Sequence, residues 1–328
     1  MTDIIDVHAH LVPRGLLEDL AAGRERFPHI EVRRHEETHV VAFSGGTPTR
    51  PVNPGLTDPD RRGAWLAEQG VTRQLAGGWL DIFGYDLPAD EGADWSARLT
   101  GALAEVAAGD DRLTALGTVP LQDPRRAAEA VTACRSAGLP GVMIATRAGG
   151  RELDDPEFTP FWEAADSCGA LVFLHPGFGG ASTRYTDFGL VNGLARLEDS
   201  TVTLARLLYA GIPARYPRAR IVVAHGGAAL PYVLGRLARN HTIDPATADP
   251  LESFGALYFD SVVFDPLALE FLVRRAGAPR VLLGSDYPFP IGDLAPADVV
   301  ARADLKDDDR AAILGGTASG LLTGGSAS

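Results

Sequence analysis

The sequence predicts a single α/β domain, a (β/α)8 TIM barrel with a small inserted segment after its first strand. Apolar, β-branched runs alternate with segments of helical period, which favours a parallel sheet covered by helices. Eight such runs occur, and eight strand–helix units make a TIM barrel. The usual length of such a barrel, about 250 residues, leaves room for insertions in this longer chain.

The predicted strands and helices follow from the spacing of apolar residues. The strands are expected at residues 3–8, 71–76, 112–118, 141–146, 170–175, 220–225, 257–263 and 280–285. The helices are expected at residues 58–69, 96–108, 123–137, 156–167, 199–210, 228–239 and 266–276. Asp-Pro pairs at Asp58, Asp123, Asp155 and Asp265 begin four of them, which is typical of an N-cap carboxylate followed by proline.

The longest departure from the repeating pattern is residues 11–57, between the first strand and the helix that follows. The alternating stretch from Ile30 to Phe43 predicts a small hairpin, and the glycines and prolines after it predict a loop. A second irregular stretch, residues 176–198, follows the fifth strand. We therefore expect one domain over residues 1–328.

Composition argues against several classes of protein. A net charge of −13 is unlike a nucleic-acid-binding protein, which needs a basic face. No apolar run approaches the ~20 residues that span a membrane, and the acidic start of the chain is unlike a signal peptide. Cys134 and Cys168 are too few for a disulfide framework, so we expect a protein of the reducing cytoplasm. Lys306 is the sole lysine, which argues against Schiff-base and P-loop chemistry.

Four predicted strands run into polar residues that could bind a metal. The first strand leads to His8 and His10, whose imidazoles share one side because side chains alternate along a strand. The fifth, sixth and eighth strands end at His175, His225 and Asp286. Each residue alone could be structural, but TIM barrels place their active sites at these strand ends. Three imidazoles and a carboxylate suit Zn²⁺ or a similar divalent ion, with a position left for water or substrate.

Other residues at strand ends are candidates for the walls of a pocket. Trp79, Tyr287 and Phe289 lie at or just beyond strand ends, although ordinary core packing is the alternative for Trp79. The remaining histidines lie away from strand ends, and we expect them at the surface: His29, His35, His39 and His241.

The strand-end motifs together resemble the amidohydrolase superfamily, and within it the branch of the 2-amino-3-carboxymuconate-6-semialdehyde decarboxylases. These motifs are His8-x-His10, His175-Pro, Ala224-His-Gly-Gly and Gly284-Ser-Asp-Tyr-Pro-Phe-Pro, and the resemblance covers nearly the whole chain. It implies a metal-dependent, nonoxidative decarboxylase of a carboxylated unsaturated or aromatic acid. A small carboxylic acid is thus the expected partner, with no nucleic acid and no membrane.

The same resemblance assigns roles at the site. The metal ligands are the residues matching His8, His10, His175 and Asp286. The match to His225 is the acid/base that handles metal-bound water, and Asp286 could relay the same proton. The predicted fourth strand, residues 141–146, has no lysine to bridge two ions, so one divalent ion is expected. Zn²⁺ is the first choice and Mn²⁺ the alternative.

Substrate-binding residues also follow from the resemblance. Arg236 matches an arginine that reaches the neighbouring subunit's site and holds a substrate carboxylate, which implies a homodimer. The family's second arginine falls near Asn53, and Arg50 is the candidate to replace it. Phe289 and Trp79 complete the predicted substrate-binding set.

Two other functions remain open from the sequence. The same five metal-site residues could serve a hydrolase or hydratase that attacks a lactone, amide, C–C or C=C bond with metal hydroxide. A non-enzymatic metal-binding barrel is the third possibility. A complete ligand set with a spare histidine argues against it.

Overall fold

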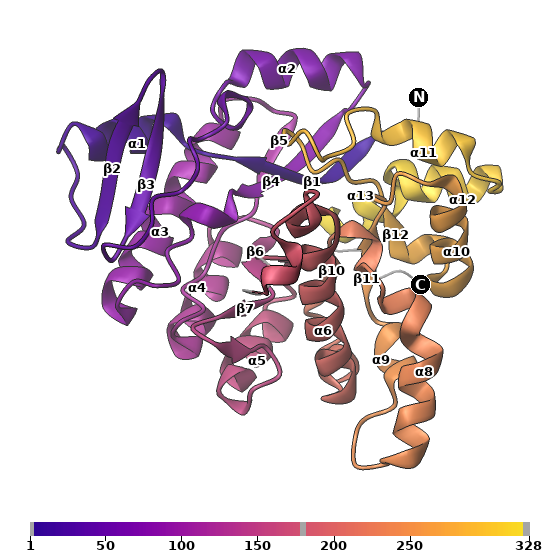
Figure 1. The fold of residues 1–328 in the computed structure, drawn as a ribbon. Coiled ribbons are helices and arrows are strands. Elements are labelled where there is room, and N and C mark those ends of the chain that lie inside the picture. Colours follow the sequence, from indigo (N-terminus) through magenta and orange to yellow (C-terminus); the bar gives the residue numbers. More distant parts are fainter. Residues whose placement is uncertain (1–2, 178–181, 324–328) are drawn as a thin grey trace.

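Eight parallel strands form the centre of the computed structural model, which describes residues 3–177 and 182–323 (Figure 1). They are β1 (Ile5–Leu11), β4 (Arg73–Gly78), β5 (Leu113–Ala115), β6 (Gly141–Ala145), β9 (Leu171–His175), β10 (Arg220–Val223), β11 (Tyr258–Asp260) and β12 (Val281–Leu282). They pair in two sheets, ordered β1-β4-β5 and β12-β11-β10-β9-β6.

Isolated parallel bridges join the two sheets at both edges. Gly117, just after β5, pairs with Val142 of β6, and Ala9 of β1 pairs with Tyr287, just after β12. Across the second junction the amide of His10 donates to the carbonyl of Tyr287 at 2.8 Å. The eight strands therefore follow one another in chain order through one continuous series of parallel contacts.

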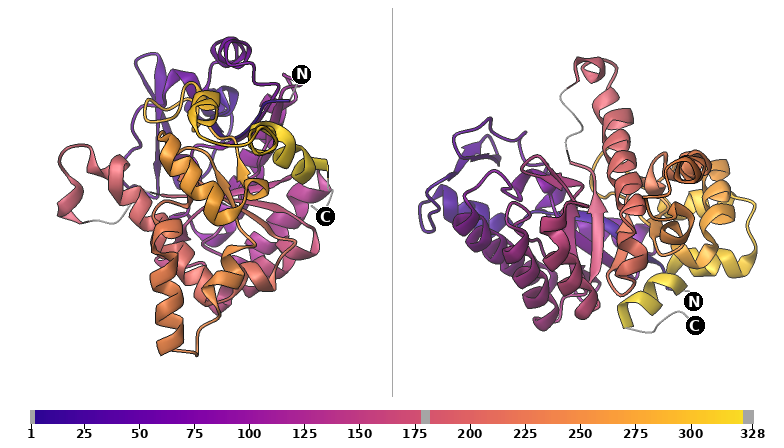
Figure 2. Two further views of the ribbon diagram at one scale, coloured as in Figure 1. Left: turned by 90° about the vertical axis from the view of Figure 1, so that its right-hand side faces the viewer. Right: turned by 90° about the horizontal axis from the view of Figure 1, so that it is seen from below.

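Helices surround these strands in all three views of the ribbon (Figures 1 and 2). They are α1 (Arg14–Ala21), α2 (Pro59–Glu68), α3 (Ala89–Ala107), α4 (Pro124–Ser136), α5 (Thr159–Ser167), α6 (Arg196–Tyr209), α7 (Ile212–Arg215), α8 (Leu230–Ile243), α9 (Pro250–Phe254), α10 (Pro266–Ala276), α11 (Pro296–Arg302), α12 (Asp307–Ala311) and α13 (Thr317–Thr323). None of the helices within the described ranges is long and apolar enough to cross a membrane.

Strand residues are buried on both faces, which explains why their sequence is continuously apolar. Val172 and Leu174 of β9 pack in one hydrophobic cluster, with helix residues such as Trp162 of α5. Leu171 and Phe173 of the same strand point the opposite way and belong to a second cluster. This alternation orients one face of each strand toward the helices and the other toward the interior.

The Asp-Pro pairs begin helical segments as the sequence predicts. The side chain of Asp58 accepts a hydrogen bond from the amide of Arg61 at the start of α2. Asp123, Asp155 and Asp265 accept equivalent backbone bonds. Each carboxylate satisfies amides that have no partner inside their own helix.

The predicted hairpin in residues 11–57 is present. It consists of β2 (Ile30–His35) and β3 (Thr38–Phe43), paired antiparallel beside α1 and α3 at one side of the molecule (Figure 1). A second, very short hairpin, β7 (Arg147–Ala148) and β8 (Arg151–Glu152), follows β6.

Some predicted boundaries were wrong. The first strand extends to Leu11 rather than ending at residue 8, so His8 and His10 lie inside β1. The first two turns of α3, from Ala89, were missed because Gly92 and the acidic residues around it weaken the helical pattern. In the stretch 176–198, a π-helical turn at Val191–Ala195 precedes α6; residues 178–181 lie outside the described residues.

Candidate metal centre and active site

The five predicted metal-site side chains meet at the carboxyl ends of the strands. His8 and His10 come from β1, His175 is the last residue of β9, and His225 and Asp286 follow β10 and β12. The imidazole centroids of His10 and His175 are 4.7 Å apart, and those of His8 and His225 are 5.3 Å apart. Residues up to 278 positions apart in the chain thus form one cluster.

The two oxygens of the Asp286 carboxylate face different histidines. Oδ1 lies 3.3 Å from Nε2 of His8, 3.1 Å from Nε2 of His10 and 3.9 Å from Nε2 of His175. Oδ2 lies 3.7 Å from Nε2 of His225. Oδ1 therefore lies near the imidazoles of His8, His10 and His175, and Oδ2 lies near that of His225.

The imidazoles of His8, His10 and His175 are each oriented by a hydrogen bond at Nδ1. Nδ1 of His8 bonds to Oδ2 of Asp260 at 2.6 Å. Nδ1 of His10 bonds to the carbonyl of Gly78 at 3.1 Å, and Nδ1 of His175 to that of Pro176 at 2.9 Å. Carbonyl oxygens only accept, so Nδ1 carries the proton in His10 and His175 and Nε2 presents a lone pair.

The converging atoms are electron-rich and buried, which fits a bound cation. Nε2 of His8, His10 and His175 and Oδ1 of Asp286 have no hydrogen-bond partner among the described residues. Buried polar atoms normally have such partners, and four unpartnered polar atoms directed at one another are costly unless a positive charge lies among them. In metal-ligating histidines, the ring nitrogen that does not bind the metal typically makes a hydrogen bond, as Nδ1 does in these three histidines.

The pKa values of the side chains in this cluster also favour a positive charge among them. Burial opposes protonation of His8, but the carboxylates of Asp286 and Asp260 raise its pKa to about 10. Burial lowers the pKa of His10 and takes that of His175 well below its usual value, so both are neutral at pH 7. Although burial raises the pKa of Asp286, the surrounding histidines hold it well below its ordinary range.

The distances alone do not separate ligand from acid/base residue. One ligand atom from each of His8, His175, His225 and Asp286 lies within 4.8 Å of the other three, and His10 is outside that group of four. His10 nevertheless lies nearer to Oδ1 of Asp286 than either His8 or His175 does.

His225 differs from the other three histidines in position and backbone. Its side chain is 14% exposed, whereas those of His8 and His10 are fully buried. Its Nδ1 has no hydrogen-bond partner among the described residues. His225 and Asp286 both have positive φ, 57° and 58°, a conformation that is uncommon outside glycine and that clusters at functional sites.

Asp260 is a part of the site that the sequence analysis missed. It ends β11 and is fully buried, with Oδ2 on His8 and Oδ1 accepting from the amides of Gly226 and Val262 at 2.8 and 3.1 Å. The strand-end rule that selected the histidines could have found it. The predicted strand extended to residue 263, which placed Asp260 inside the strand.

Replacing Asp260 with asparagine should weaken metal binding by about 10- to 100-fold, the usual effect of losing a ligand's outer hydrogen bond. The amide oxygen must stay with the two backbone donors, which leaves the NH₂ group facing Nδ1 of His8. That nitrogen must then accept, so Nε2 of His8 carries the proton and must lose it before it can bind metal. Competition with a metal-binding dye measures the affinity.

The matched control is Asp265→Asn, which alters an exposed N-cap carboxylate five residues away. Asp265→Asn should bind metal as the wild type does. Equal affinities for Asp260→Asn and the wild type would contradict the role given to Asp260.

A cavity of about 780 Å³ opens onto the cluster and includes His10, His175, His225 and Asp286 in its lining. Its apolar wall is formed by Val262, Val263, Phe264, Phe289 and Ile291. The predicted wall residues Trp79 and Phe289 both line it, and the ring of Phe289 lies 5.2 Å from that of His10. Tyr287 was predicted wrongly, because it packs on Trp65 and Arg62 instead.

The arginines of the cavity are only partly those expected. Arg50 lines it, with its guanidinium 5.9 Å from the ring centre of Trp79. Arg236 is exposed on α8 and does not line the cavity of its own chain. Arg196, at the start of α6, also lines the cavity. The sequence analysis missed it because it lies in an irregular stretch without periodicity.

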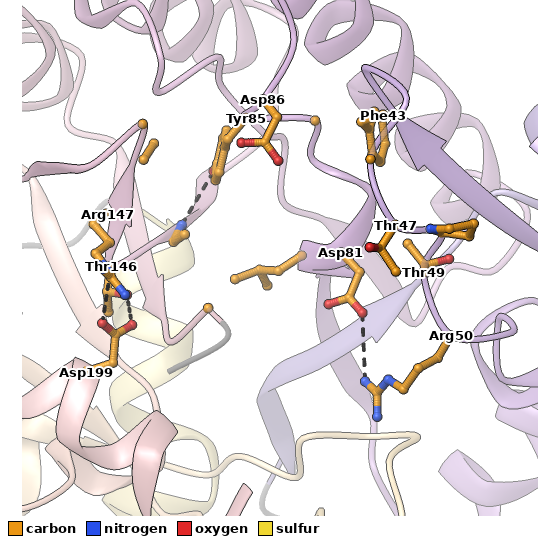
Figure 3. Close-up of a pocket in the computed structure, with 18 residues that line it drawn as sticks. Phe43, Thr47, Thr49, Arg50, Asp81, Tyr85, Asp86, Thr146, Arg147 and Asp199 are labelled. Atoms are coloured by element: carbon orange, nitrogen blue, oxygen red, sulfur yellow. Dashed lines mark hydrogen bonds and ion pairs between the residues drawn. The ribbon is translucent and has the colours of Figure 1, made fainter. Parts of the chain in front are cut away.

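A second cavity, of about 560 Å³, borders the first (Figure 3). The two share Arg50, Leu80 and Asp81 in their linings. Figure 3 shows Asp81 directed toward Arg50, and on the other side of this cavity Arg147 and Thr146 joined to Asp199.

Residues 5–323 match the model of a protein family described as Amidohydrolase. The chain is 28% identical over 330 residues to the 2-amino-3-carboxymuconate-6-semialdehyde decarboxylase of Dictyostelium discoideum, covering 97% of this chain and 91% of that protein. It is 27% identical to the enzyme of that name from Caenorhabditis elegans, covering 90% and 88%.

Solved structures share the fold over nearly the full length. The 5-carboxyvanillate decarboxylase of Sphingomonas paucimobilis superimposes with a TM-score of 0.82 at 22% identity, covering 98% of this chain and 99% of that one. A dihydroxybenzoic acid decarboxylase from Polaromonas sp., solved with bound manganese, has a TM-score of 0.76 at 21% identity, covering 100% and 98%.

Proposed function

Since this chain belongs to the amidohydrolase family, we propose that it is a metal-dependent, nonoxidative decarboxylase of a carboxylated unsaturated or aromatic acid. The observation that supports this most is the convergence of four histidines and Asp286, four of which line the cavity: His10, His175, His225 and Asp286. The relatives named above are decarboxylases of such acids, which favours this reaction over others that the same residues could perform.

We assign the metal to His8, His10, His175 and Asp286, because Oδ1 of Asp286 and the Nε2 atoms of these three histidines converge. When bound, the metal supplies Lewis acidity, which orients a substrate oxygen and lowers the pKa of water. A ligand set of three imidazoles and one carboxylate suits Zn²⁺, and Mn²⁺ is the alternative because the similar enzyme from Polaromonas sp. holds it.

His225 is the proposed acid/base. When the bond between the substrate carbon and its carboxylate breaks, CO₂ leaves and the bonding electrons stay on that carbon, which must then take up a proton. His225 borders the cavity, is partly exposed and lies next to Oδ2 of Asp286, so it can deliver that proton and be reprotonated from water. The apolar wall around Phe289 positions the hydrocarbon part of the substrate.

A hydrolase or hydratase of a lactone, amide, C–C or C=C bond is the alternative that uses the same residues. The experiment that decides is ¹³CO₂ release from carboxyl-labelled aromatic and unsaturated acids, with Zn²⁺- or Mn²⁺-loaded protein and lactones and esters in parallel. We expect release that stops when the metal is removed. Cleavage of a lactone or ester without CO₂ would contradict decarboxylation.

The homodimer remains a proposal. Arg236 is exposed and does not line the cavity of its own chain, which supports the idea that it serves the neighbouring subunit's site. We expect sedimentation to show a dimer and Arg236→Gln to weaken substrate binding without changing metal content. A fully active monomer would contradict this.

We further infer that the continuous series of strand contacts is a (β/α)8 barrel formed by one domain, with residues 11–57 as a small insertion. The reducing cytoplasm remains the proposed location, which agrees with Cys134 and Cys168 both being free.

A further inference from the structure

Four buried polar side chains form a hydrogen-bonded group that the proposed reaction does not use. They are Asp6, Arg62, Gln74 and Ser285, each at most 4% exposed, and they make up the Asp6 network. They come from β1, α2, β4 and the segment just after β12. None of the four lines either cavity described above. Burying polar groups is costly unless they are well paired, so this network is expected to have a task.

Asp6 lies at the centre of the network and accepts every hydrogen bond that it makes there. Its Oδ1 accepts from the backbone amides of His8 and Ser285 at 3.0 and 3.1 Å. Its Oδ2 accepts from Nε2 of Gln74 at 2.8 Å and from the hydroxyl of Ser285 at 2.6 Å. Four bonds fill the acceptor sites of a carboxylate. Asp6 therefore fastens β1 at His8 to the turn that carries Asp286.

Arg62 fixes the direction of the hydrogen bonds in the network. Its Nη1 donates to Oε1 of Gln74 at 2.6 Å, and its Nη2 donates to the carbonyl of His10. A guanidinium cannot accept, so the amide oxygen of Gln74 must face Arg62 and its NH₂ group must face Asp6. The side chain at position 6 must therefore accept, which a carboxylate does.

The network also restrains the backbone on both sides of Asp286. The amide of Ser285 donates to Asp6, and the hydroxyl of Ser285 accepts from the amide of Tyr287 at 3.1 Å. The guanidinium of Arg62 lies 4.8 Å from the ring centre of Tyr287. The φ of Asp286 is 58°, and a residue other than glycine keeps such a conformation only where its surroundings hold it. These contacts supply that restraint.

We propose that the Asp6 network sets the positions of three metal ligands through their backbone. It bonds to the amide of His8, to the carbonyl of His10 and to the amides on both sides of Asp286. Its members are positioning residues, because they bond to the backbone of the ligands and lie outside the cavity. The inference rests on the proposed ligand set and concerns the affinity and the geometry of the metal site.

The test is Asp6→Asn, measured by competition for Zn²⁺ with a metal-binding dye and by the visible absorption of the Co²⁺-loaded protein. The introduced amide oxygen can keep the two backbone donors, which places its NH₂ group against that of Gln74. Gln74 cannot turn, because its NH₂ group would then face Arg62. We expect this clash to displace the ligands, to lower Zn²⁺ affinity by about 10- to 100-fold and to shift the Co²⁺ bands.

The double variant Asp6→Asn/Gln74→Glu should restore most of the affinity and the wild-type Co²⁺ bands. It exchanges the carboxylate and the amide, so the NH₂ group donates to the carboxylate at position 74, which still accepts from Arg62. The hydroxyl of Ser285 can then donate to the carbonyl of His8, 3.2 Å away. A role in overall stability alone would lower the Tm of the metal-free protein and leave the Co²⁺ bands of the folded protein in place.

The matched control is Asp110→Asn, whose carboxylate bonds to Arg112 just before β5, at the amino end of that strand. It should keep the wild-type affinity and bands. If Asp6→Asn does not fold, Ser285→Ala removes only the hydroxyl and should change both measurements in the same direction.

Unchanged affinity and bands in the folded single variant, or a double variant that is no better than Asp6→Asn, would overturn the inference. If the variants change metal binding as expected but the wild type releases no ¹³CO₂ from any acid, the positioning network stands and the decarboxylase function fails.

Discussion

Replacing His225 with alanine is expected to leave the metal bound while kcat falls at least ~100-fold, the lower end of the usual contribution of a positioned acid/base group. His225 faces Oδ2 of Asp286, whereas His8, His10 and His175 face Oδ1. Deleting it therefore removes a proton donor at the cavity and leaves the converging set of acceptors intact. Metal content by plasma spectrometry and ¹³CO₂ release measure the two effects separately.

His241→Ala is the matched control, because His241 lies on α8 and bonds to Thr247 away from the cavity. It should change neither metal content nor rate. Loss of the metal from His225→Ala would show that His225 is a ligand. It would then favour the group His8, His175, His225 and Asp286, whose ligand atoms lie within 4.8 Å of one another.

His10→Ala should give the opposite pattern, with loss of both the metal and the activity. His10 is fully buried, its Nδ1 is held by the carbonyl of Gly78, and its Nε2 is 3.1 Å from Oδ1 of Asp286. Removing one of four ligands should lower metal affinity by more than the roughly 10- to 100-fold typical of outer hydrogen-bond partners. Equilibrium dialysis against buffered Zn²⁺ measures the affinity.

The same variant should lose the thermal stabilisation that the metal gives. A ligand that binds only the folded protein stabilises it by about 2.7 kcal/mol at a concentration of 100 Kd. Adding Zn²⁺ should therefore raise the Tm of the wild type and of His225→Ala, and raise that of His10→Ala much less. Full metal content and the same rise in Tm for His10→Ala would remove His10 from the ligand set.

Local patterns predicted the parts of this protein that depend on neighbours in the chain. The strands are buried on both faces and therefore read as continuous apolar runs, and the Asp-Pro pairs begin helical segments because the cap is local. His8 and His10 were found because two residues of separation place both on one side of β1.

Residues in irregular segments could not be placed from their spacing. Arg196 follows a π-helical turn, and Arg50 lies in a loop after β3, so no period indicates where either side chain points. Tyr287 was placed wrongly for a related reason. The chain turns after Asp286, and the ring packs on Trp65 of α2, more than 200 positions away.

The residue types at the strand ends were enough to indicate a metal site and the family that the chain resembles. The tertiary structure decided which atom of each side chain is presented. The Nε2 of His8 is directed inward because Nδ1 donates a hydrogen bond to Asp260, 252 positions away. Asp286 distinguishes three histidines from the fourth, because its Oδ1 faces the group that includes His10 and its Oδ2 faces His225. Periodicity determines the face on which a side chain lies, but tautomer and charge depend on hydrogen bonds that only the folded chain brings together.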